Sequence, residues 1–178
     1  MESGRRARVL VVDDEEVNID VVAAYLEPEF EILRAVDSEL ALAMITGPTR
    51  PDAILLDVNM PGLDGYEVCA RIKSDPATAS IPVLFFTALD QDEAVCFEVG
   101  ADDYVQKPLN VPVLVARLKT QLRLREALER VGQLEGMLGV ADREREQLER
   151  RQQKLVDLLK KRTAANAGAM VARQRTVS

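Results

Sequence analysis

The chain has 178 residues, 47% of them hydrophobic, which is enough to fill the core of one ordinary domain that carries an appendage. It contains no run of about 18 consecutive apolar residues, and its polar start lacks the apolar core of a signal peptide. We therefore expect a cytoplasmic protein that neither spans nor binds a membrane. The sequence has no histidine, which excludes phosphohistidine chemistry on this chain.

Charge divides the chain into two parts. Residues 1–123 contain 11 basic and 22 acidic side chains, whereas residues 124–178 contain 12 and 8. This difference predicts two physically distinct segments, and the acidic first segment should repel nucleic acid. Cys69 and Cys96 both lie in apolar stretches, where buried thiols are expected rather than a disulfide framework.

The first segment alternates short apolar runs with amphipathic stretches of helical length. In chain order, strands are expected at 8–12, 29–33, 52–56, 83–87 and 103–107, and helices at 17–26, 39–45, 65–73, 91–99 and from near Val111 onward. This alternation predicts an α/β domain with a doubly wound, five-stranded parallel sheet covered on both faces. Ligands of such sheets bind beside the carboxyl ends of the strands.

The residues expected at those strand ends form a chemically coherent set: Asp13, Asp14, Glu15, Asp57, Thr87 and Lys107. Crowded carboxylates repel one another unless a cation lies among them, and Mg²⁺ prefers such oxygen ligands. An ammonium and a hydroxyl can bind the oxygens of a transferring phosphoryl group, which leaves Asp57 as the nucleophile. Taken singly, the acidic residues also fit the simpler interpretation of helix N-caps.

Four segments, VLVVDDEE, LLDVNMPGLDGYE, FFTA and DDYVQKPL, resemble the receiver domain of bacterial two-component response regulators. The resemblance covers roughly residues 7–123 and implies a flavodoxin-like fold. It further implies that Asp57 is the phosphoacceptor, charged by a histidine kinase or phosphotransfer protein. No enzymatic activity is then expected beyond the chain's own phosphorylation and dephosphorylation.

The same resemblance assigns roles to the other residues of the predicted site. Asp14 and Asp57 would bind Mg²⁺ directly, Asp13 largely through water, and Asn59 through its backbone carbonyl. Thr87 and Lys107 would bind the phosphoryl oxygens. Thr87 and Tyr104 would act as the switch pair, although Tyr104 could also be an ordinary edge-strand aromatic, and the peptide bond before Pro108 would be cis.

The second segment has the heptad pattern of a coiled coil, in which the a and d positions are apolar. The seam that would dimerise includes Leu124, Val131, Leu134, Leu138, Leu148, Leu155 and Leu159. We expect a parallel, two-stranded stalk over residues 124–163 that continues the last receiver helix, with Arg145 and Gln152 as polar a positions, and a disordered tail over 164–178. Glycines 132, 136 and 139 predict a soft joint. The alternatives are a helix that folds back on its own receiver, a linker whose coiled coil is only marginal, and a stalk that dimerises constitutively.

Other functions remain open at this stage. A flavodoxin-like nucleotide or flavin binder would need a glycine-rich turn after the first strand, where this chain has DDEE. A hydrolase with an aspartyl-phosphate intermediate would need a second acid/base carboxylate, and Asn59 stands two residues after Asp57. The output could be a protein partner, or an effector domain of the cyclase or phosphatase type in a longer regulator.

Overall fold

The structure of the chain is a computed structural model. It describes the backbone of residues 5–87 and 93–175, and the side chains of residues 5–87 and 95–156. The chain forms two compact units, residues 1–128 and residues 129–178. Within the described residues, no helix has a stretch that is both long enough and apolar enough to cross a bilayer.

The first unit is built on a five-stranded parallel sheet. The strands are β1 (Arg8–Val12), β2 (Glu31–Ala35), β3 (Ala53–Leu56), β4 (Val83–Thr87) and β5 (Asp103–Gln106), arranged in the order β2-β1-β3-β4-β5. The chain leaves β1 toward one edge and returns on the other side of it, so the strand order reverses between β1 and β3. A crevice is expected beside the carboxyl ends of these two strands.

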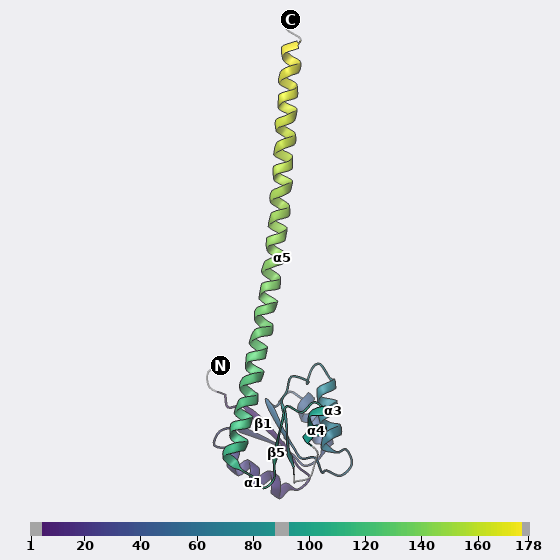
Figure 1. The fold of residues 1–178 in the computed structure, drawn as a ribbon, viewed down its shortest axis with the longest axis vertical. Coiled ribbons are helices and arrows are strands. Elements are labelled where there is room, and N and C mark those ends of the chain that lie inside the picture. Colours follow the sequence, from purple (N-terminus) through teal and green to yellow (C-terminus); the bar gives the residue numbers. More distant parts are fainter. Residues whose placement is uncertain (1–4, 88–92, 176–178) are drawn as a thin grey trace. The chain divides into compact units, whose positions relative to one another are not determined.

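Helices cover both faces of the sheet (Figure 1). They are α1 (Glu16–Leu26), α2 (Ser38–Thr46), α3 (Gly65–Ser74), α4 (Glu93–Glu98) and α5 (Val111–Arg175). One apolar cluster joins α1 and the first turns of α5 to the sheet, and a second joins α2, α3 and α4 to its other face. All residues of β3 and β4 are buried, as expected for parallel strands that lie between two layers of helices. The predicted fold class is confirmed.

Most of the described boundaries lie within one residue of the sequence expectation, and those of β2 and α5 differ by more. Strand β2 begins at Glu31 rather than at Glu29, because the amides of Glu29 and Phe30 both donate to the Leu26 carbonyl and so belong to the turn that ends α1. Helix α5 continues through residues 164–175, where a disordered tail was expected. Residues 176–178 of that tail lie outside the described residues, as do residues 91–92 of the helix expected at 91–99.

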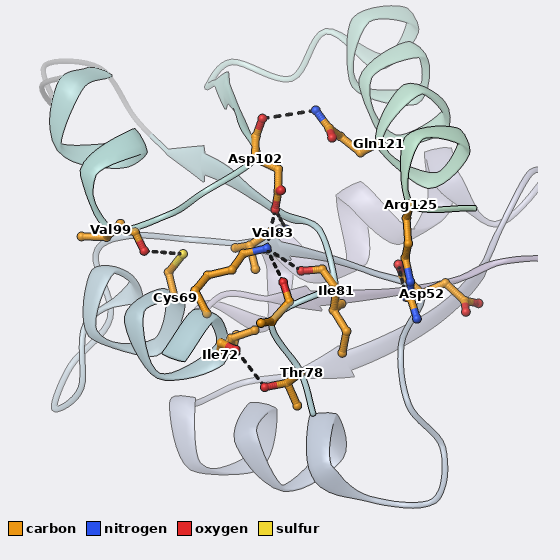
Figure 2. A network of polar contacts seen from close by, with 12 residues as sticks. Asp52, Cys69, Ile72, Thr78, Ile81, Val83, Val99, Asp102, Gln121 and Arg125 are labelled. Carbon is orange, nitrogen blue, oxygen red and sulfur yellow. Dashed lines mark hydrogen bonds and ion pairs between the residues drawn. The ribbon is translucent and has the colours of Figure 1, made fainter. Parts of the chain in front are cut away.

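Polar contacts join α5 to loops at the amino edge of the sheet (Figure 2). Asp102 accepts hydrogen bonds from Lys73 and from the backbone amide of Val83, and its carbonyl accepts one from Gln121. Arg125 donates to the carbonyl of Asp52, 2.8 Å away. The bonds of Gln121 and Arg125 therefore hold α5 against the amino edge of the sheet, and the functional side chains lie at the opposite, carboxyl edge.

Candidate functional site

Three carboxylates meet where the strand order reverses. Asp13 and Asp14 are the first two residues after β1, and Asp57 is the first residue after β3. One carboxylate oxygen from each of the three lies within 4.8 Å of the other two. The backbone amide of Asp57 donates to the carbonyl of Val12, which continues the β1–β3 ladder and holds the two strand ends together. Asp13 and Asp57 are buried, whereas Asp14 is exposed. The crowding that the sequence predicted is therefore present.

Lys107 reaches this cluster from the end of β5. Its Nζ donates to Asp13 Oδ2 and to Asp57 Oδ1, at 2.9 Å in each case, and lies 5.2 Å from the centre of the Phe86 ring. The backbone amide of Lys107 donates to the carbonyl of Thr87, which sets the ends of β4 and β5 side by side. The ammonium thus bridges two carboxylates that come from different strands.

The electrostatics of the cluster reflect burial and this bridge. Burial raises the pKa of Asp57 above its ordinary value of 3.8, and the charge of Asp13 raises it further, against the hydrogen bonds from Lys107 and the Asn59 amide. Burial alone would lower the pKa of Lys107, but its bonds to Asp13 and Asp57 outweigh burial and raise it. Asp57 is therefore a carboxylate whose negative charge is only partly compensated, and a further cation would stabilise it.

Asp57 is held by its own loop. The backbone amide of Asn59 donates to Asp57 Oδ2 over 3.0 Å, and the amide of Gly65 donates to the carbonyl of Val58 over 2.9 Å. A Cβ atom on Gly65 would lie 2.2 Å from the Asp57 carbonyl oxygen, so only glycine fits at the start of α3. Asp64 caps α3 through a reciprocal capping box with Glu67, which fixes the far end of the loop.

The remaining predicted site residues lie on the neighbouring strands. Thr87 is buried at the end of β4, and the Lys107–Pro108 peptide bond is cis. Tyr104 on β5 is partly buried against the α2–α4 cluster and makes an edge-on contact with Phe97, with ring centres 6.1 Å apart. Asn59 is exposed beside Asp57.

Sequence patterns did not single out two residues that shape this site. Asn18, in the first turn of α1, donates to Asp13 Oδ1 over 2.9 Å and so orients that carboxylate together with the Glu15 amide. Gly65 was expected only as the start of a helix, and its close approach to Asp57 depends on the tertiary fold. Neither residue stands at a spacing that a sequence rule recognises.

The donor set fits a hard divalent cation. Each of the three carboxylates offers an oxygen within a span that one ion could bridge, and the pocket faces the open edge of the sheet. Oxygen ligands of this kind suit Mg²⁺ rather than a thiolate-seeking metal, and both cysteines are buried elsewhere.

Residues 9–119 match the response regulator receiver domain family. The chain belongs to this family. It therefore contains a receiver domain of two-component response regulators, and its five-stranded fold and acidic pocket are those that its sequence motifs indicated.

Relatives among characterised proteins include the response regulator PleD of Caulobacter vibrioides, 43% identical over 132 residues, an alignment that covers 72% of this chain. The phosphate regulon transcriptional regulatory protein PhoB of Pseudomonas aeruginosa is 42% identical over 118 residues, which is 65% of this chain. The alignments span only 29% of PleD and 51% of PhoB, so the similarity concerns the receiver and not the whole of either relative.

Solved structures give the same result. A CheY-like receiver domain protein from Methanospirillum hungatei superimposes with a TM-score of 0.63 at 26% identity, covering 68% of this receiver chain and 98% of its own. NtrX from Brucella abortus gives a TM-score of 0.64 at 30% identity, covering 72% of this chain and 29% of its own.

Proposed function

We propose that this receiver is a phosphorylation switch in which Asp57 accepts a phosphoryl group from a phosphohistidine of a histidine kinase or phosphotransfer protein. The observation that carries the proposal is the position of Asp57: a buried carboxylate at the strand crossover, next to two other carboxylates and bridged by Lys107. These 178 residues contain no histidine, so they do not themselves supply the donor imidazole.

In the proposed reaction, an Asp57 carboxylate oxygen attacks phosphorus, the P–O bond forms, and the P–N bond to the donor imidazole breaks. The imidazole leaves with the bonding electron pair and takes a proton from water. In the structure, the Lys107 ammonium bridges Asp13 and Asp57. From this position it could form an ion pair with a phosphoryl oxygen as negative charge spreads over the phosphoryl group. The Thr87 hydroxyl, at the adjacent strand end, would bind another of these oxygens.

Mg²⁺ would be held by Asp13, Asp14, Asp57 and the carbonyl of Asn59, and would supply charge neutralisation of the phosphoryl oxygens. The protein groups themselves orient the acceptor. Asn18 and the Glu15 amide hold Asp13, and the Asn59 amide holds one oxygen of Asp57 so that the other faces Lys107. The catalysis that we propose is limited to the chain's own phosphorylation and dephosphorylation.

We also propose an output through the switch residues and the stalk. Movement of Thr87 toward the phosphoryl group would make room for Tyr104, which is the basis of the proposed switch. The described seam side chains of α5 are exposed in the single chain, among them Leu134, Leu138 and Leu148, and a second copy would cover them in a parallel dimer. The side chain of Leu159, the last predicted seam residue, lies outside the described residues.

The first test is phosphorylation by acetyl phosphate with Mg²⁺, read on a phosphate-affinity gel. The wild-type chain should acquire one base-labile phosphoryl group, and Asp57→Ala should acquire none. Asp20→Ala, which removes an exposed carboxylate on α1, should behave as wild type. Undiminished phosphorylation of Asp57→Ala would overturn the assignment.

The second test is sedimentation with Mg²⁺, with and without beryllofluoride as a phosphoryl mimic. We expect the wild-type mass or shape to change on addition of beryllofluoride. If beryllofluoride binds and sedimentation stays the same, the link between pocket and dimer is wrong and the dimer is constitutive.

A further inference from the structure

The apolar seam of the stalk is interrupted at Arg145. Within residues 129–156 the seam positions are Val131, Leu134, Leu138, Ala141, Arg145, Leu148, Gln152 and Leu155. Arg145 Nε donates to Glu149, one turn further along, over 3.2 Å, and the two side chains are 77% and 62% exposed. An exposed pair of this kind adds little to a lone helix. Its place at a core position therefore needs another explanation.

Heptad geometry shows what surrounds Arg145 when two copies pair in parallel. A g residue of one helix lies beside the e residue five positions later on the other helix, and a core a side chain packs next to the partner's preceding g residue. In this chain the g residue is Glu144 and the e residue is Glu149. Glu144 would thus face the partner copy's Glu149, a like-charge contact that opposes pairing.

We propose that Arg145 bridges its own Glu149 and the partner copy's Glu144, and that this charged layer aligns the two stalks parallel and in register. The inference rests on the dimer proposed above and deepens it by naming what specifies the partner. By symmetry, the layer contains two guanidinium groups and four carboxylates. Each guanidinium lies between the two carboxylates that would otherwise repel, and the bond already formed to Glu149 holds it there.

A slip by one heptad does not provide this layer. If one helix slips by a heptad, the partner's g position beside Arg145 is no longer occupied by Glu144. It is occupied by Met137 for one copy and by Arg151 for the other. The in-register pair also places Arg130, a g residue, beside the partner copy's Glu135, which is an opposite-charge contact. A polar a residue that is satisfied in only one register is a known means of selecting that register.

The test uses two full-length copies with opposite charges in this layer. One copy carries Arg145→Glu, which leaves only carboxylates in its homodimer. The other carries Glu144→Lys and Glu149→Lys, which leaves only cations. We expect each copy alone to dimerise with a dissociation constant raised at least about tenfold, since like charges brought together in a seam oppose pairing. Mixing the two copies should restore the wild-type dissociation constant as a one-to-one heterodimer, detected by native mass spectrometry with a tag on one copy.

A matched control separates register from overall charge. Arg150→Glu in one copy, and Glu129→Lys with Glu146→Lys in the other, change the net charges equally but at exposed positions outside the seam. The control copies should homodimerise as the wild type does and show no preference for each other. Undiminished homodimers of the charge-reversed copies, or an equal preference in the control set, would overturn the inference. A monomeric wild type would instead overturn the proposed dimer itself.

Discussion

Replacing Lys107 with methionine tests whether the ammonium is what offsets the two buried carboxylates. The substitution keeps most of the side chain's bulk and its contact with the sheet, but removes both hydrogen bonds. The carboxylates that lose their partner, Asp13 and Asp57, have side chains only 4% and 7% exposed. Water can therefore replace little of what the ammonium supplies.

The expected loss follows from this burial. Removing one member of a buried ion pair costs about 3–5 kcal/mol, and because the Lys107 side chain is 23% exposed the lower end applies, about 3 kcal/mol at pH 7 without Mg²⁺. The loss should shrink as the pH falls. Burial already raises the pKa of Asp57, so the Asp57 carboxyl keeps its proton more readily in the native state than in the unfolded chain. The contribution of this group to stability is therefore lost as the pH rises through the native pKa, and at lower pH the protonated carboxyl no longer needs the ammonium.

The assay is urea unfolding followed by circular dichroism at pH 7 and pH 5, in EDTA and in Mg²⁺. Mg²⁺ should reduce the deficit, because carboxylates that have lost the Lys107 ammonium should bind the cation more tightly than those of the wild type and so gain more from it; a ligand at about a hundred times its dissociation constant adds about 2.7 kcal/mol to the native state. Lys119→Met is the control, because it removes only an exposed pair with Glu29 and should cost less than about 1 kcal/mol at either pH. A Lys107→Met deficit that is the same at both pH values and with Mg²⁺ would refute the reasoning.

Three further predictions concern the acceptor loop and the stalk. Asp57→Asn should stabilise the metal-free protein at pH 7, because burial makes the ionised carboxylate unfavourable, and urea unfolding should show the gain vanish as the pH approaches 3.8. Gly65→Ala should lower the free energy of unfolding by about 2 kcal/mol or more and slow phosphorylation by acetyl phosphate, because its Cβ would lie 2.2 Å from the Asp57 carbonyl oxygen. The control is Gly132→Ala, whose Cβ would meet nothing within 4 Å and which should add up to about 1 kcal/mol of helix stability. Equal stability of the two variants would contradict this contrast. Leu148→Asn with Leu155→Asn should raise the dimer dissociation constant at least about a hundredfold by sedimentation, since each helix loses two leucines that the proposed dimer would bury, and an unchanged value would place the interface on the receiver.

Local sequence determined most of the receiver's secondary structure. Buried parallel strands must be apolar on both faces, so β3 and β4 appear in the sequence as short continuous apolar runs with clear ends. Since parallel strands all end at one edge, Asp13, Asp57 and Lys107 could be brought together in prediction before any coordinates were known. The start of β2 was misplaced because Phe30 is apolar and buried, and periodicity cannot tell a helix-terminating turn from the first residue of a strand.

The tertiary structure alone decided how the site is held. Asn18 orients Asp13 from a different element, and the space beside the Asp57 carbonyl requires glycine at position 65, but neither fact follows from residue spacing along the chain. The raised pKa of Asp57 likewise depends on burial between two strands and on the distance to Lys107. Sequence patterns record which side of an element is apolar. They do not record the distances between side chains of different elements, and those distances determine the chemistry of this pocket.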